Sequence, residues 1–214
     1  MNNAWDWENV KDEYWMKPDG FVMAFGQALI ETGQKKIFDL ACGMGRHVKY
    51  LTGLGLDVFG CDSSEYSVNH VNEWLKFKGI EKRIQLIDMI ELKEKNNEYD
   101  AVLAFHAIYH NTYENMMKII EKIWRMLKPD GVAMITFLFD AELTSETTEK
   151  KEFIENDGPE QGIPHVVMNK EYIPKILDKF LISQIWNVEH VYDSGKRGYH
   201  CIAEIKAMKK EKTK

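Results

Sequence analysis

The chain has 214 residues, of which 44% are hydrophobic and 29% charged, a composition typical of a folded globular protein and not of a disordered one. This length predicts one domain, which buries enough apolar surface to fold without disulfides or metal ions. No apolar stretch reaches the roughly 20 residues of a membrane helix, and the acidic, aromatic N-terminus does not resemble a secretion signal. The three cysteines form no CxxC pair, which predicts a reduced, cytoplasmic protein.

The negative charge is concentrated in one segment. The chain has 34 acidic and 28 basic residues, a net charge of −6, and residues 140–160 alone contain eight acidic and two basic ones. The remainder of the chain is therefore neutral overall, which disfavours a broad basic face for nucleic acid. We expect neither nucleic acid nor a membrane as a partner.

Short apolar runs alternate with longer amphipathic ones along most of the chain, which predicts βαβ units around a parallel sheet. Glycine and proline residues mark the ends of several helices, and residues 128–131 are predicted to form a turn. The expected strands are residues 36–41, 57–62, 84–88, 100–105 and 132–138, and the expected helices are residues 45–53, 64–78 and 113–127.

The alternation stops after the fifth strand. Residues 140–165 are polar and acidic, which predicts a long loop that serves as a lid or binding segment. A helix is expected at 171–180, followed by strands at 181–191 and 199–206. Residues 193–198 contain two glycines and suit a hairpin connection, so the last strand should be antiparallel. We expect a single domain, with residues 1–34 as an N-terminal cap and 140–168 as an acidic insertion.

Acidic side chains fall where three successive strands end. Asp39 precedes a glycine-containing turn with Gly43 and Gly45, Asp62 ends the second strand and Asp88 the third. Ligands bind at the carboxyl ends of parallel strands, so these acids should converge on one crevice that favours a cation over a pyrophosphate. The dinucleotide-binding fingerprint is also incomplete, because Val48 stands at its third glycine. A tight strand-to-helix turn without a ligand is the simpler alternative.

These residues resemble the cofactor site of class I S-adenosylmethionine-dependent methyltransferases. The resemblance spans about residues 35–140 and includes residues 39–46, Asp62, Asp88, and the segments 99–105 and 127–131 in the expected order. Residues 162–165 also resemble a segment of small-molecule members, including tellurite-resistance-type and quinone-biosynthesis-type enzymes. The resemblance implies an α/β fold with a Rossmann-like, seven-stranded mixed sheet, an antiparallel last strand and helices on both faces.

The resemblance also implies roles for single residues around S-adenosylmethionine. The methionine part should lie along the glycine turn, Asp62 should accept the ribose hydroxyls, and Asp88 should meet the adenine amino group. Arg46 has two open roles, a bond to the cofactor carboxylate or a solvent-facing position, and Ala41 stands where many members have glycine. The expected cofactor-binding residues are Asp39, Ala41, Gly43, Gly45, Arg46, Asp62, Ser63, Asp88, Met89 and Phe105.

Catalysis is harder to assign, because methyl transfer depends mainly on positioning. His110 and Tyr109 are the catalytic candidates: they orient or deprotonate the acceptor, or they only shape the pocket wall. His106 and His110 have the spacing of helical metal ligands, but the sequence offers no third partner. We therefore expect no metal site.

Residues outside the common core should contact the acceptor, and Trp7, Tyr14, His106 and His165 are the candidates. The N-terminal aromatics form either a lid or a helix packed on the core, and His165 either faces the acceptor or caps a loop. Aromatic faces and the acidic segment favour a neutral or cationic acceptor.

The sequence thus predicts a methyltransferase, monomeric or homodimeric, that transfers a methyl group from S-adenosylmethionine to a small molecule. A non-catalytic, regulatory adenosylmethionine-binding module is the first alternative. The second is a nicotinamide-dependent oxidoreductase, which Asp39 and the missing third glycine disfavour.

Overall fold

A mixed β-sheet forms the centre of the protein in the computed structural model, which describes residues 5–209 except 11, 94, 141–142, 144–148 and 192–196. The strands are β1 Lys36–Leu40, β2 Asp57–Asp62, β3 Ile84–Leu86, β4 Tyr99–Ala104, β5 Leu127–Phe139, β6 Lys150–Ile154, β7 Pro164–Met168, β8 Phe180–Val191 and β9 Arg197–Ala207. The helices are α1 Gly20–Glu31, α2 Arg46–Gly53, α3 Glu65–Phe77, α4 Tyr113–Met126 and α5 Ile173–Ile176.

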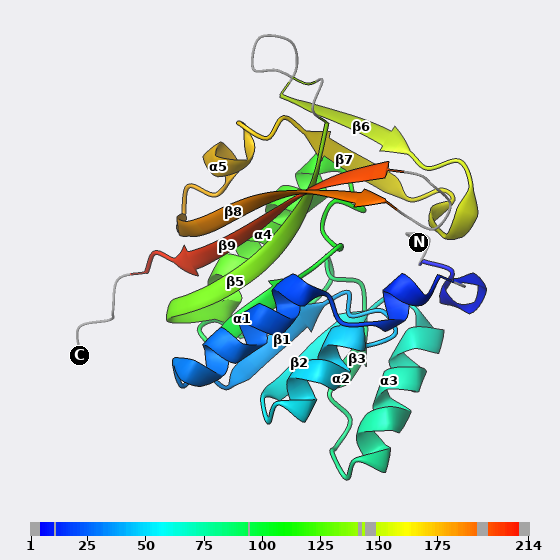
Figure 1. The fold of residues 1–214 in the computed structure, drawn as a ribbon, viewed down its shortest axis with the longest axis vertical. Coiled ribbons are helices and arrows are strands. Elements are labelled where there is room, and N and C mark those ends of the chain that lie inside the picture. Colours follow the sequence, from blue (N-terminus) through cyan, green and yellow to red (C-terminus); the bar gives the residue numbers. More distant parts are fainter. Residues whose placement is uncertain are drawn as a thin grey trace.

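Seven strands follow the predicted topology. Strands β3, β2, β1, β4 and β5 are parallel neighbours in that order, β9 pairs antiparallel with β5, and β8 pairs antiparallel with β9 (Figure 1). This confirms the mixed sheet with an antiparallel last strand. The chain runs outward from β1 to β3 and then returns to β4, so the carboxyl ends of β1 and β4 flank the switch point where open α/β sheets bind ligands.

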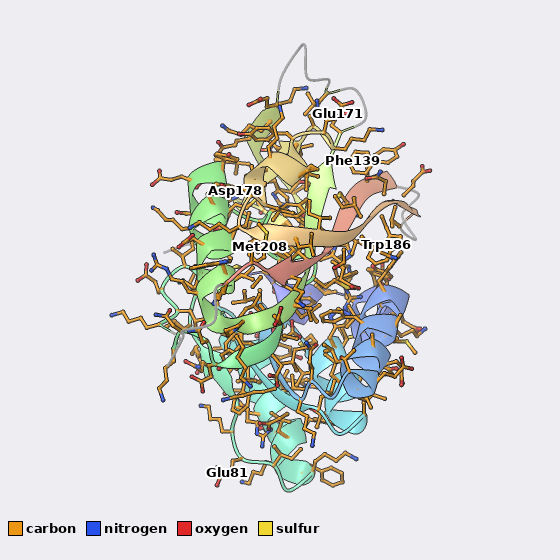
Figure 2. All side chains as sticks on the ribbon, turned by 90° about the vertical axis from the view of Figure 1, so that its left-hand side faces the viewer. Glu81, Phe139, Glu171, Asp178, Trp186 and Met208 are labelled. Carbon is orange, nitrogen blue, oxygen red and sulfur yellow. The ribbon has the colours of Figure 1, made fainter. Side chains whose placement is uncertain are left out.

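Helices cover both faces of the sheet. On one face α1, α2 and α3 pack against residues such as Ile37 and Leu103, and on the other α4 and α5 pack against Phe38 and Val102. Figure 2 shows the green helix α4 and the blue helix α1 on opposite sides of the strands. Neighbouring residues in β1 and β4 therefore place apolar side chains on opposite faces of the sheet, which is the pattern of a buried parallel strand.

Side-chain caps set the helix ends that the sequence predicts. The Ser64 hydroxyl accepts the Ser67 backbone N–H at the start of α3, and Thr112 caps α4 in the same way through Asn115. Gly79, with φ +73°, follows α3 and allows the chain to turn. These elements match their expected ranges within a few residues.

Two predicted elements differ in extent. Residues 128–131 continue β5 instead of leaving it, and the irregularity appears as a register shift against β4 and a φ of +62° at Asp130. The helix expected at 171–180 is reduced to α5, because Phe180 already pairs with Ala207 at the start of β8. Sheet pairing at the end of the segment therefore overrides its local helical pattern.

The largest difference concerns residues 140–165, for which a loop was the expectation. Strands β6 and β7 form an antiparallel pair there, and β7 extends the sheet because Leu138 and Phe139, at the end of the long strand β5, pair with Val167 and Met168. Of the segment expected as a hairpin connection, residues 193–196 lie outside the described part of the chain. None of the described helices has the length and apolar character needed to cross a membrane.

Candidate functional site

A pocket opens at the carboxyl ends of β1, β2 and β4, and it spans about 980 Å³ when the open solvent at its mouth is included. Twelve predicted site residues line it: Trp7, Asp39, Ala41, Gly43, Arg46, Asp62, Ser63, Asp88, Met89, Phe105, His106 and His110. Gly45, Tyr14, Tyr109 and His165 are not among its lining residues. The convergence of three acids that the strand order predicts is therefore present.

The turn between β1 and α2 places its backbone against the pocket. Ala41, Gly43 and Gly45 all have positive φ, at +53°, +52° and +71°. A Cβ at Gly43 would lie 2.4 Å from the Trp7 ring, whereas one at Gly45 would meet Val71 below the turn. Gly43 is thus required by close approach at the pocket, and Gly45 by packing of α2 on α3.

Asp62 connects this turn to the start of α3. One carboxylate oxygen accepts the Gly43 N–H at 2.8 Å, and the other accepts the Ser64 N–H at 2.9 Å. Burial raises the pKa of Asp62, while these backbone hydrogen bonds oppose the rise. The side chain is held in one position with oxygen lone pairs left for a ligand hydroxyl.

Asp39 is a buried acid whose Oδ2 has no hydrogen-bond partner among the described residues. Burial raises its pKa to about 8, against the attraction of Arg46, and Asp62 adds repulsion. Asp88 lies beyond β3, where its Oδ1 accepts the Ile90 N–H at 2.8 Å. Three carboxyl groups at one edge of the sheet favour a ligand that carries positive charge, because such a ligand stabilises their ionised forms, and a sulfonium and an ammonium group fit this requirement.

Arg46 is only 7% exposed, so the solvent-facing alternative is wrong. Its guanidinium donates to the carbonyl oxygens of Tyr14 and Lys17, and it lies 4.9 Å and 5.1 Å from the ring centroids of Tyr14 and Trp15. Arginine suits this position because it combines a planar donor fork with stacking on aromatic faces. The residue therefore joins the glycine turn to the N-terminal segment.

The N-terminal segment forms an aromatic strap, which we define as Trp5, Trp7, Tyr14 and Trp15. The ring of Trp5 stacks on Trp7 at 5.1 Å and meets Trp15 edge-on at 5.0 Å. Of the strap residues, Trp7 lies in the 3₁₀ turn Trp7–Asn9, and Tyr14 and Trp15 lie in the 3₁₀ turn Glu13–Met16. Neither turn contains a buried residue, so the core-packed helix is wrong for these residues. Figure 1 shows the backbone of this N-terminal segment, in dark blue, and its turn Trp7–Asn9 contacts α3.

A buried polar chain begins directly after β4. His106 has a φ of +53°, a strained conformation for a residue with a side chain. Its Nε2 lies 3.2 Å from the Tyr14 hydroxyl and its Nδ1 lies 2.9 Å from the Tyr109 hydroxyl, which in turn lies 3.3 Å from Nε2 of His200. Tyr109 is therefore part of this chain, whereas His106 also borders the pocket.

His110 borders both the main pocket and a second pocket of about 1150 Å³, which His165 and Tyr109 also line. Burial lowers the pKa of His110 to about 3, although the charge of Glu160 opposes the shift. A histidine with so low a pKa is neutral at physiological pH and is a weak base. This favours an orienting or ligating role for His110 over proton abstraction.

The fold brings further residues to these pockets. Trp5 and Trp15 belong to the N-terminal aromatics expected as a lid but were not among the acceptor candidates, and both line the two pockets. His200, in β9, and Glu160, beside β7, lie far along the chain, and no sequence pattern indicated them. The main pocket is also lined by residues that were not named as site candidates: Cys42, Met44, His47, Cys61, Ala107, Asn111, Ile163 and Pro164.

Comparisons with known proteins find methyltransferases. The family model described as "Methyltransferase domain" matches residues 37–131, from β1 into β5. The chain is 29% identical over 121 residues to the phosphoethanolamine N-methyltransferase of Plasmodium falciparum, covering 56% of this chain and 45% of that protein. It is 25% identical over 100 residues to the sterol 24-C-methyltransferase erg6 of Aspergillus fumigatus, covering 45% of this chain and 26% of that one. The chain thus spans less than half the length of both curated relatives.

The fold is shared with solved structures. The Burkholderia thailandensis 1,6-didemethyltoxoflavin-N1-methyltransferase, crystallised with 1,6-didemethyltoxoflavin and S-adenosylhomocysteine, has a TM-score of 0.69 and 15% identity. The similarity covers 89% of this chain and 80% of that one. The Rossmann-like fold predicted from the sequence is confirmed.

Proposed function

We propose that this chain, which carries a class I S-adenosylmethionine-dependent methyltransferase domain, transfers a methyl group from that cofactor to a small-molecule acceptor. The observation that carries the proposal is the convergence of Asp39, Asp62 and Asp88 in one pocket with the backbone of Gly43, against which the Trp7 ring packs. The family match and the shared fold support both the activity and the cofactor.

The chemistry of the pocket's residues fits the cofactor. Asp62 would hold the ribose diol, Asp88 the adenine amino group, and Met89 the face of the ring, as the resemblance implies. The buried carboxyl of Asp39, without a described partner at Oδ2, would stabilise the positive end of the ligand. S-adenosylmethionine supplies an electrophilic methyl group when bound, and the protein's task is then to position the acceptor and exclude water.

The acceptor is proposed to be a neutral or cationic small molecule, such as an amine, a thiol or a heterocycle. The rings of Trp5, Trp7 and Trp15 line the pocket and offer flat, electron-rich faces to a planar or positively charged group. The relatives named for phosphoethanolamine, sterol and didemethyltoxoflavin are consistent with a small acceptor. His106 and His110 border the same space and would orient it.

We also propose that the protein works in a reducing compartment, the cytoplasm, because its three cysteines are free and buried. That it is a monomer or a homodimer remains a prediction.

Calorimetric titration with S-adenosylhomocysteine, S-adenosylmethionine and the dinucleotide NAD tests the proposal. We expect binding of the first two and none of NAD, followed by methyl transfer from isotope-labelled S-adenosylmethionine in a screen of amines, thiols and heterocycles. Binding without transfer to any acceptor class would favour the regulatory module, and binding of NAD alone would favour the oxidoreductase.

A further inference from the structure

Three side chains that commonly ligate metal ions converge beside the cofactor pocket: His110, Glu160 and His165. Nδ1 of His110 lies 2.8 Å from Nε2 of His165, and that nitrogen lies 3.2 Å from a carboxylate oxygen of Glu160. The three ligand atoms all lie within 4.8 Å of one another. Atoms bound to one zinc ion at about 2.0–2.1 Å lie roughly 3–3.5 Å apart, so the cluster needs little movement to close around an ion.

The three residues come from different elements (Figure 1): the loop between β4 and α4, the 3₁₀ turn Gly158–Glu160, and β7. Backbone hydrogen bonds fix these elements to one another. Val166, next to one histidine, donates to the carbonyl of Tyr109, next to the other, at 2.9 Å, and the Ile163 N–H donates to the Glu160 carbonyl at 2.9 Å. The backbone therefore holds the cluster together without help from a ligand.

The hydrogen bond at the far side of His165 orients its ring for metal binding. Nδ1 lies 3.0 Å from the Ile163 carbonyl oxygen, which can only accept, so Nδ1 carries the proton and the neutral ring presents the lone pair of Nε2 to the cluster. A backbone carbonyl on the second nitrogen is the usual support of a metal-ligating histidine. The ring is 3% exposed and stacks on Phe153 at 5.1 Å.

His110 is suited to the same role. Among the described residues no group bonds its buried Nε2, and a proton on that nitrogen leaves the Nδ1 lone pair for an ion. Hydrogen bonds within the cluster do not satisfy all three groups. Nε2 of His165 can make one well-directed hydrogen bond, yet it faces both Nδ1 of His110 and the Glu160 carboxylate. A divalent cation takes a lone pair from each of the three groups at once.

We propose that His110, Glu160 and His165 bind one divalent transition-metal ion of the zinc class. Two imidazole nitrogens and one carboxylate favour such an ion over calcium or magnesium, which prefer oxygen ligands. Three protein ligands leave at least one position open on a tetrahedral ion, as in metal sites that contact a substrate. The site lies between the two pockets that share His110, so its open position is available to the proposed acceptor.

Metal binding by tag-free, chelator-treated protein tests this site without any assay of methyl transfer. Equilibrium dialysis against Zn²⁺ and Co²⁺ measures the stoichiometry, and the visible absorption of bound Co²⁺ reports its coordination. The variants are Glu160→Gln and His165→Ala, and the control is His70→Ala, which removes a surface histidine on α3 that contacts only Lys49 among the described hydrogen bonds.

We expect about one equivalent of metal in the parent protein and in His70→Ala, and at least tenfold weaker binding in both site variants. If His165→Ala folds poorly, Glu160→Gln still tests the site, because Glu160 is partly exposed and its substitution should leave the protein folded. Substoichiometric binding by the parent, or equal binding by all variants, would overturn the proposal. Since the assay needs no cofactor, failure of the metal site and failure of the methyltransferase activity are distinguishable.

Discussion

The guanidinium of Arg46, in the first turn of α2, donates a 2.9 Å hydrogen bond to the backbone carbonyl of Tyr14. This contact joins residues 32 positions apart in the sequence and fastens the aromatic strap to the glycine turn. It also leaves Arg46 buried, where its positive charge partly opposes the rise in the pKa of Asp39 that burial causes. Arg46 thus connects the strap to the pocket through a hydrogen bond, ring contacts and its charge.

Arg46→Ala should release the strap. Charge-assisted hydrogen bonds contribute about 1.5–3 kcal/mol each, so hydrogen exchange should become faster at backbone amides of residues 12–17, with weaker binding of S-adenosylhomocysteine. Arg46→Lys is the matched control, because it keeps the charge and loses the planar donor fork. Unchanged hydrogen exchange in the alanine variant would show that Arg46 does not hold the strap in place.

Cofactor binding should order the proposed lid, residues 1–16 and 140–165, of which the structure describes 5–10, 12–16, 140, 143 and 149–165. Closure over the pocket would exclude water from the reacting groups, so both segments should exchange more slowly with S-adenosylhomocysteine than without it. Amides of β9, paired on both sides, serve as the internal reference. Equal protection in the two states would reject the lid and, with it, the assignment of both segments as a cap and an insertion.

Asp62→Ala should weaken cofactor binding at least about tenfold, because a charged acceptor of ribose hydroxyls is lost. The structure adds a second effect: the Gly43 and Ser64 amides lose their acceptor, so the protein should also be destabilised. Titration calorimetry and thermal unfolding measure the two effects. Asp178→Ala, an exposed position labelled in Figure 2, should change neither, and unaltered affinity in Asp62→Ala would contradict the assignment.

Gly43→Val should abolish cofactor binding while the protein remains folded or is mildly destabilised. The new side chain would occupy pocket space, clash with Trp7 and require a left-handed backbone that disfavours branched residues. Adding Trp7→Ala relieves the clash with the strap but should not restore binding. Gly55→Val is the matched control, since φ is +86° there but no atom lies within 4 Å of its Cβ position. Restored binding in the double variant would show that the cofactor does not lie against this turn.

Asp39→Asn should stabilise the free protein and weaken cofactor binding. The folded protein keeps the proton on Asp39 up to about pH 8, whereas the unfolded chain releases it near the ordinary value of 3.8. The stability contributed by this group therefore falls as pH rises between those values. The asparagine variant lacks this loss, so its advantage in thermal midpoint should grow from pH 5 to pH 8. A constant difference across this range would contradict the raised pKa.

The sequence by itself determined the parallel core and the cofactor-binding edge. Local sequence patterns predict the core elements, which are strands β1, β2 and β4 and helices α2, α3 and α4. These patterns are apolar runs, caps such as Ser64, and glycines at positive φ. The positions of Asp39, Asp62 and Asp88 follow from the topology, because the carboxyl ends of parallel strands share one edge. For this reason the sequence predicts that three acids, spread over nearly fifty residues of the chain, lie in one pocket.

Only the tertiary structure decided the rest. The acidic segment reads as a loop, yet β6 and β7 form because β5 is long enough to offer Leu138 and Phe139 as pairing partners. The burial of Arg46, the meeting of Tyr109 with His200, and the cluster of His110 with Glu160 and His165 depend on contacts between distant elements. Local propensity carries no information on such contacts, since packing and sheet pairing fix them only when the whole chain has folded.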